Sequence, residues 1–264
     1  METPRILVAV AWPYANGPLH LGHVAGSLLP PDIFAGHQRM KGAKVAMVSG
    51  SDMHGTPITV AAEKAGMAPE AFAAKYNESH KASLAALGIK FDLFTSTATT
   101  NHREVVHDVF LTLHKQGYIT KQTMTAPYDP QARRFLPDRY VEGTCPHCAF
   151  EGARGDQCDS CGRTLDPQDL KNPRSKLSGA APEYRETEHF FLRLPAFQQR
   201  LEAYTTNHRD HWRSNTINFT ENWLKEGLKD RPITRDMLYG VTIPLEGYDD
   251  KRIYVWFEAV IGYL

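Results

Sequence analysis

Neither sign of charge dominates this sequence, because Lys and Arg together number 30 and so do Asp and Glu. A protein that binds nucleic acid through a broad basic surface has an excess of Lys and Arg. Any contact of this chain with RNA therefore requires local basic patches or a region outside these residues. No apolar run approaches the length of a membrane span. The apolar stretch at 6–12 is too short for a signal peptide and is followed by Pro13. We therefore expect a cytoplasmic protein with no membrane association.

Cysteine is scarce as well, with four residues that all fall between positions 145 and 161. They read C-P-H-C, nine intervening residues and C-D-S-C, a spacing typical of four thiolates around one structural zinc ion. We predict that Cys145, Cys148, Cys158 and Cys161 bind one Zn²⁺ that does no chemistry. Two disulfides would use the same residues but are rare inside cells, and a redox C-x-x-C occurs singly beside a βα junction. His147 is not needed as a ligand, because four sulfurs complete the coordination.

The first 117 residues alternate between strand and helix patterns. Buried strands are predicted at 6–10, 45–49 and 91–94, and helices from His20 onward and at 69–87 and 101–116. This order is typical of a parallel sheet with crossover helices, so we predict an α/β fold with a Rossmann-like parallel sheet.

The pattern changes after Gly117, where turn residues, prolines and the cysteine cluster replace helical periodicity. We predict a first half of the parallel-sheet domain over 1–117, an inserted module over 118–230 with its zinc knuckle at about 140–165, and the start of the second half over 231–264. Within these regions, helices are expected at 195–204 and 219–227, and a buried strand at 252–257 followed by a helix from Glu258. Because the sequence stops inside a helix pattern, we expect an N-terminal piece of a longer protein.

The segment Tyr14–His23, Y-A-N-G-P-L-H-L-G-H, follows the first predicted strand. His20 and His23 are three residues apart, about one helical turn, and Gly22 leaves the turn between them without a side chain. A strand-to-helix turn is where parallel sheets bind ligands, and the start of a helix favours anions. We therefore predict that both imidazoles face the phosphates of a nucleotide. The alternative is a chance H-x-G-H whose histidines lie on the surface or in the core.

Three further positions are candidates with open alternatives. Asp52, after the second strand, could hold a ligand ammonium or cap the helix that follows Gly55. Arg235 could meet a phosphate or carboxylate, or form an exposed ion pair. The aromatic residues of 254–263 could line an apolar pocket suited to a thioether side chain, or form ordinary core.

With these residues in view, the chain resembles the catalytic part of the methionyl-tRNA synthetase family, which are class I aminoacyl-tRNA synthetases. The resemblance runs over nearly the whole length. Besides the double C-x-x-C insert, it rests on five segments: the opening that ends in H-L-G-H at His20–His23, G-S-D-x-H-G-T-P at Gly50–Pro57, N-W-L-K-E-G-L-K-D at Asn222–Asp230, I-T-R-D at Ile233–Asp236 and Y-V-W-F-E-A-x-I-G-Y at Tyr254–Tyr263.

The resemblance implies the class I synthetase fold with a zinc-bearing connective insertion, and a methionine–tRNA ligase activity. Its substrates would be L-methionine, ATP with Mg²⁺, and tRNA(Met), and its first product methionyl-adenylate. Methionine would contact Ala11, Trp12, Tyr14, Asp52, Trp256, Ala259 and Tyr263. ATP would contact Tyr14, Asn16, Gly17, His20, Gly22 and His23, and the catalytic residues would be His20, His23 and Arg235.

Some positions depart from the family pattern, namely Trp12, Pro30-Pro31, Arg231 and Val260. We expect Pro30-Pro31 to interrupt a helix that is otherwise continuous. The family's lysine-rich KMSKS loop and anticodon-binding domain are not in this sequence, so we expect the chain alone to be weakly active or inactive. Two other functions are open: a small nucleotidyltransferase, which also uses H-x-G-H but has no such insert, and a truncated paralogue whose zinc knuckle binds RNA or a partner.

Overall fold

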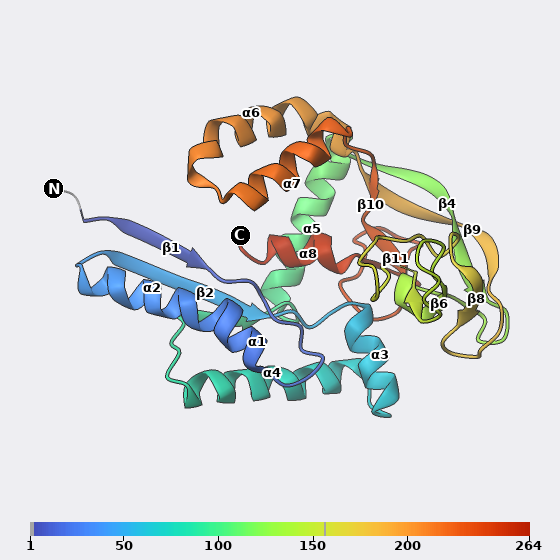
Figure 1. Ribbon diagram of the computed structural model, residues 1–264, viewed down its shortest axis with the longest axis horizontal. Helices are drawn as coiled ribbons and strands as arrows, with labels where there is room; N and C mark the ends of the chain where they lie inside the picture. Colours follow the sequence, from blue (N-terminus) through green and yellow to red (C-terminus); the bar gives the residue numbers. More distant parts are fainter. Residues whose placement is uncertain (1–2, 156) are drawn as a thin grey trace.

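The computed structural model describes residues 3–155 and 157–264. Figure 1 shows a small parallel sheet with helices α2 and α4 toward one end of the molecule and the long strands β4 and β9 toward the other, with α5 and α8 between them. Within the described residues, no helix is both long and apolar enough to cross a membrane.

The parallel sheet confirms the α/β prediction. Its strands are β1 (Arg5–Ala9), β2 (Lys44–Ser51) and β3 (Leu93–Ser96), in the order β1-β2-β3. Buried apolar side chains, among them Val10, Leu28, Met47 and Leu84, pack against one another between this sheet and its helices. These helices are α1 (Leu21–His23), the π-helical turn η1 (Val24–Leu28), α2 (Leu29–Met40), α3 (Thr56–Lys64), α4 (Pro69–Ala86) and α5 (Thr100–Lys115). The carboxyl ends of β1 and β2 open on the same edge of the sheet, where ligands of such folds bind.

The prediction that Pro30-Pro31 interrupts the first helix was wrong. Residues 21–40 run through three consecutive helical segments, and the two prolines lie in the first turn of α2. A proline has no N–H to continue the backbone hydrogen-bond ladder, so the regular α-helical pattern changes next to the pair. The turn just before it is π-helical, with the Leu29 N–H donating to the carbonyl oxygen of Val24. This irregular turn accommodates the prolines without a break in the helix.

Among the described residues, the chain after Gly117 builds two antiparallel sheets of three or more strands, and a two-stranded sheet follows them. The larger has the order β10-β9-β4-β5 and the smaller β7-β6-β8. Their strands are β4 (Ile119–Asp129), β5 (Arg134–Phe135), β6 (Val141–Thr144), β7 (Ala153–Arg154), β8 (Lys171–Ser175), β9 (Glu183–Leu192) and β10 (Arg231–Pro232). Between β9 and β10 lie the helices α6 (Gln198–His208) and α7 (Ser214–Lys225), close to the predicted ones. The short 3₁₀ helices are η2 (Asp138–Tyr140), η3 (Leu194–Phe197) and η4 (Arg209–His211).

The predicted strand at 252–257 is only half correct. Strand β12 (Lys251–Ile253) pairs antiparallel with β11 (Thr234–Asp236), and the helix α8 (Val255–Ile261) begins three residues before Glu258. The run R-I-Y-V-W-F favours a strand by residue type, but a short apolar run does not distinguish a strand from a buried helix. The Tyr254 N–H donates to the carbonyl oxygen of Ile233, and from that point the backbone turns into the helix.

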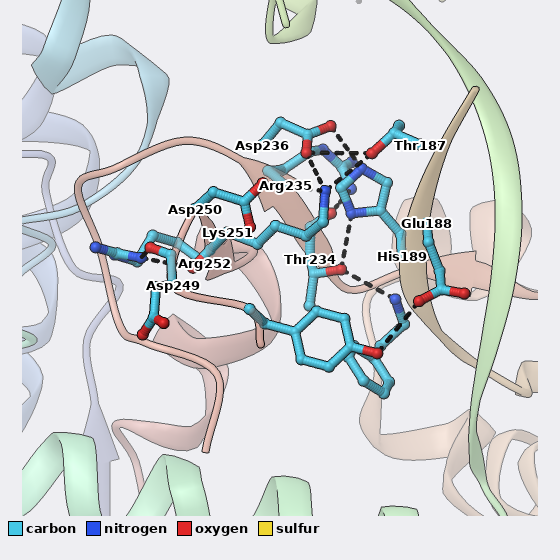
Figure 2. Close-up of polar contacts among 12 residues, drawn as sticks. Thr187, Glu188, His189, Thr234, Arg235, Asp236, Asp249, Asp250, Lys251 and Arg252 are labelled. Carbon is cyan, nitrogen blue, oxygen red and sulfur yellow. Dashed lines mark hydrogen bonds and ion pairs between the residues drawn. The ribbon is translucent and has the colours of Figure 1, made fainter. Parts of the chain in front are cut away.

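A buried polar network joins β9 to β11 and β12 (Figure 2). His189 bonds Thr234 through Nδ1 (2.9 Å to Oγ1) and Asp236 through Nε2 (3.0 Å to Oδ2). The Lys251 ammonium forms an ion pair with Asp236 and donates to Thr187 Oγ1 at 2.9 Å. Burial opposes ionisation of Asp236, but its bonds to His189 and Lys251 outweigh burial and lower its pKa. Because removing one member would leave a buried charge unpaired, this network fixes the larger sheet against the last strands.

Candidate functional site

The two histidines of the H-L-G-H segment stack on each other at the start of the first helix. Their ring centroids are 3.8 Å apart, with 27° between the ring planes. His20 is the N-cap of α1, and its Nδ1 accepts from the Gly22 N–H at 3.1 Å, while His23 Nδ1 accepts from the His20 N–H at 3.3 Å. Burial and the neighbouring imidazoles of His20 and His80 lower the pKa of His23. The two rings therefore lie together at the start of the first helix, as their three-residue spacing indicates, and their contact with phosphates stays a prediction.

Gly22 is what allows His20 to fold over the helix start. A Cβ at this position would lie 3.0 Å from Cε1 and 3.1 Å from Nδ1 of the His20 ring. Those distances are tighter than ordinary van der Waals contact, so any side chain at 22 would displace the ring. In this structure the His20 ring lies over the bare backbone of Gly22, and the contact of Gly22 with a nucleotide stays a prediction.

The loop before His20 is hydrogen-bonded to His80, a histidine that the sequence analysis did not predict to be part of the site. His80, on α4, is buried and bonds the carbonyl oxygen of Gly17 through Nε2 and the hydroxyl of Ser51 through Nδ1, each at 3.0 Å. Burial lowers the pKa of His80, so the neutral ring donates to Gly17 and accepts from Ser51. This arrangement connects the Asn16-Gly17 loop to the end of β2.

Asp52 lies beside Tyr14 at the carboxyl ends of β1 and β2. The Asp52 N–H donates to the carbonyl oxygen of Pro13 at 2.9 Å, and the Ala15 N–H donates to that of Asp52 at 2.8 Å. The capping alternative is excluded, since Gly55 is the N-cap of α3 and no side chain caps it. Asp52 is 5% exposed, and burial together with the negative charge of Glu258 raises its pKa well above the usual range.

Aromatic residues from the first loop and from the end of the chain pair with one another. The rings of Tyr14 and Trp256 meet edge to face at 6.3 Å, and those of Trp12 and Tyr263 at 5.8 Å. Trp256 is 63% exposed, so the alternative of ordinary core does not hold for it. The departure at position 12 has a structural basis, because a Cβ at Gly50 or at Gly262 would lie 2.9 Å from the Trp12 ring.

The remaining predicted positions are less closely grouped by contacts. Ala11 and Asn16 are exposed in the loop between β1 and α1, and Ala259 lies half-buried on α8. The Arg235 guanidinium lies 4.0 Å from the Tyr254 ring centroid and donates to the carbonyl oxygens of Pro232 and Thr234. These contacts hold it within its own segment, so its catalytic role stays a prediction.

The four cysteines converge as their spacing predicts. Their sulfur atoms lie within 4.8 Å of one another, a set that could hold a metal ion. The Cys148–Cys158 and Cys145–Cys161 sulfur pairs are 3.6 and 3.9 Å apart, much longer than the S–S bond of about 2.05 Å, and the cysteines are free thiols. Cys145 and Cys158 are buried in a small apolar cluster with Val141, Ala153 and Leu170. The donor set is the four-sulfur type that zinc prefers.

The comparisons with known proteins agree with this geometry. Residues 6–264 match the family model described as tRNA synthetases class I (M). The chain belongs to this family. It is 58% identical over 260 residues to a methionine–tRNA ligase of Dehalococcoides mccartyi strain CBDB1. This alignment covers 98% of this chain and 47% of that protein. It is 56% identical over 262 residues to the methionine–tRNA ligase of Roseiflexus sp. strain RS-1, covering 98% of this chain and 44% of that protein.

A solved structure in the same family has the same fold. The structure of Mycobacterium tuberculosis methionyl-tRNA synthetase in complex with methionyl-adenylate aligns with a TM-score of 0.73 and 23% identity. The alignment covers 99% of this chain and 46% of that one. This synthetase-family chain therefore spans about half the length of the relatives that it matches.

Proposed function

We propose that this chain is the amino-acid- and nucleotide-binding half of a cytoplasmic methionine–tRNA ligase. The observation that carries the proposal is the grouping of Asp52, Tyr14 and Trp256 at the carboxyl edge of the parallel sheet, in a chain 58% identical to methionine–tRNA ligases. The substrates are L-methionine, ATP with Mg²⁺ and tRNA(Met). The proposed domains are 1–117 and 231–264 for the catalytic fold, with 118–230 inserted.

The first half-reaction follows from the chemistry of these groups. Ionised Asp52 pairs with the ammonium of methionine, and the aromatic rings around Tyr14 and Trp256 surround its thioether, which gains about 0.3–1.5 kcal/mol for each sulfur–ring contact. A carboxylate oxygen of methionine then bonds the α-phosphorus of ATP as the bond to the β-phosphate oxygen breaks. Pyrophosphate leaves, and methionyl-adenylate remains.

The imidazoles of His20 and His23 act on the phosphates. Negative charge on the phosphoryl oxygens grows as the bond to pyrophosphate stretches, and fixed N–H donors stabilise that charge most when they need no rearrangement. Stacking holds the two rings together at the helix start, and His80 holds the loop that precedes them. Donors fixed in this way suit a transition state more than a ground state.

The cysteine cluster has a separate role. When bound, Zn²⁺ would organise the β7-β6-β8 sheet, and Cys145, Cys148, Cys158 and Cys161 would hold it. Four sulfurs leave no open position for a substrate, so the metal would be structural. Arg133, in the turn between β4 and β5, is exposed and available for a contact with the RNA backbone, whereas the neighbouring Arg134 is paired with Glu63.

The decisive assay is amino-acid-dependent exchange of pyrophosphate into ATP, run with each standard amino acid on the complete reading frame that contains these residues. We expect exchange with methionine at least about 100-fold above that with leucine or isoleucine, since a pocket lined by aromatic rings and fitted to a flexible thioether discriminates against branched chains. The 264-residue chain by itself is expected to exchange weakly or not at all.

Exchange that depends on another amino acid would refute the assignment to methionine. No exchange with any amino acid would favour the non-catalytic alternative, in which the zinc knuckle binds RNA or a partner. The same reaction without an amino acid is the control for exchange that does not depend on amino-acid activation.

A further inference from the structure

A fully buried carboxylate lies beside the proposed amino-acid pocket and has no role in the steps above. Glu258, on α8, is 0% exposed. Its Oε1 lies 2.7 Å from His54 Nδ1 and its Oε2 lies 2.6 Å from His102 Nε2. A carboxylate is almost never fully buried unless it is paired, because the loss of water costs several kcal/mol. Two short bonds from ring nitrogens satisfy this one.

The three residues come from three separate parts of the fold, and each of them lies next to a residue of the proposed pocket. His54 follows Asp52 by two residues, and its N–H donates to Asp52 Oδ1 at 3.2 Å. His102 is in the first turn of α5, with its ring 6.4 Å from that of Trp12. Glu258 lies on α8 between Trp256 and Tyr263. The cluster therefore joins the ammonium-binding side of the pocket to its aromatic side.

We propose that Glu258, through His54 and His102, is a positioning residue that holds the two sides of the methionine pocket together beside the carboxylate of Asp52. The inference rests on the proposed function, because it concerns the pocket assigned there. It adds three residues to that site, and it predicts how the charge of Glu258 affects Asp52.

The electrostatic part follows from the surroundings of the two carboxylates. Burial opposes ionisation of Glu258, but hydrogen bonds from His102 and His54 outweigh it and lower its pKa. For Asp52 the balance is reversed, because burial and the charge of Glu258 raise its pKa and the single N–H of His54 offsets them in part. The pKa values of these two neighbouring carboxyl groups therefore shift in opposite directions, which favours the ionised form of Glu258 and the neutral form of Asp52.

The other groups that face Asp52 do not change this conclusion. Tyr14 from the first loop and Tyr239 from the segment before β12 have pKa values raised by burial and by nearby carboxylates, so both hydroxyls stay neutral. His54 contributes its N–H from the same turn. Because the ammonium of methionine pairs with the ionised carboxylate, methionine would bind more weakly as the pH falls through the raised pKa of Asp52.

Two substitutions at Glu258 distinguish the effect of its charge from the effect of its side-chain length. Glu258→Gln keeps the size and removes the charge, so Asp52 ionises more readily and the pH midpoint of methionine affinity moves to lower pH. Glu258→Asp keeps the charge and shortens the side chain, so the midpoint stays near that of the unmodified protein. Each variant is expected to weaken methionine binding about tenfold at the plateau, because small displacements at a site are costly, while the KM for ATP changes by less than about twofold.

The measurement is methionine affinity by tryptophan fluorescence across the pH range, together with the KM values in pyrophosphate exchange, on the complete reading frame. Val106→Ala is the matched control, since Val106 is buried on the same helix as His102 but packs in the core below the site. Val106→Ala is expected to lower the melting temperature and to leave the pH midpoint of methionine affinity unchanged.

If the Glu258 variants do not fold, histidine ring ¹⁵N NMR of the unmodified protein replaces them. The ring signals of His54 and His102 are expected to shift when methionine is added. Absence of methionine binding to the unmodified protein would overturn the proposed function and the pocket with it. Methionine binding with ring signals that do not move, or with a Glu258→Gln midpoint equal to that of the unmodified protein, would overturn the inference on Glu258 alone.

Discussion

Replacing His20 and His23 together by alanine is expected to lower methionine-dependent pyrophosphate exchange by about 10²–10⁴-fold. The loss follows from the removal of two donors fixed at the helix start, one of which also caps the helix. The effect should fall on kcat more than on the KM for methionine, since Asp52 and the aromatic rings that bind methionine are unchanged. The readout is the rate of exchange at saturating methionine and ATP.

The cap makes a control necessary, because the loss of an N-cap costs about 0.5–2 kcal/mol of stability by itself. His20→Asn keeps an acceptor for the Gly22 N–H, and Asn is a preferred N-cap residue. Paired with His23→Gln, it preserves amide donors at both positions. This variant is expected to retain more exchange than the double alanine variant, with the same melting temperature as the unmodified protein. A double alanine variant with unchanged kcat would show that the phosphates bind elsewhere.

Removing the metal from the cysteine cluster has the second large expected effect. Elemental analysis should find one zinc ion for each chain, and Cys145→Ser should lose it. The strands of the β7-β6-β8 sheet are only two, four and five residues long, too short for an independent core. Structural zinc supplies about 10–16 kcal/mol of coupled binding and folding free energy. Without it, residues of about 140–176 are expected to unfold while the parallel sheet persists.

Limited trypsin digestion tests this prediction, because cleavable residues such as Arg154, Arg163 and Lys171 lie within the affected segment. The variant should be cut there rapidly and the unmodified protein slowly. His147→Ala is the control, since the His147 ring contacts Arg163 and four sulfurs suffice for the ion. Equal digestion of both proteins, or zinc retained in Cys145→Ser, would contradict the structural role of the metal.

Local patterns predicted much of the fold. The strands and helices of the first 117 residues, the placement of His20 and His23 at a helix start and the convergence of the four cysteines depend on residues close together in sequence, so spacing alone predicts them. The stacking of the two imidazoles was not predicted. The errors arose where tertiary contacts decide the backbone. Pro30-Pro31 lies within a helix because a π-helical turn precedes it, and Val255–Phe257 is helical because Tyr254 bonds the backbone of Ile233.

The Glu258 cluster could not be predicted from the sequence. Glu258 is 204 positions from His54 and 156 from His102, and neither spacing carries a periodic signal. Only the fold brings the three elements together. His80 was missed for the same reason, since a single histidine in an amphipathic helix is usually an ordinary surface or core residue. One signal was available in hindsight, namely that a buried-looking helix position held a titratable residue.

The most direct test of the central claim is a crystal structure of the complete protein with methionine and a non-hydrolysable ATP analogue. The account predicts phosphate oxygens within hydrogen-bonding distance of the His20 and His23 rings, and the methionine ammonium on the carboxylate of Asp52. A nucleotide bound elsewhere, with the two imidazoles facing only water or apolar side chains, would contradict it.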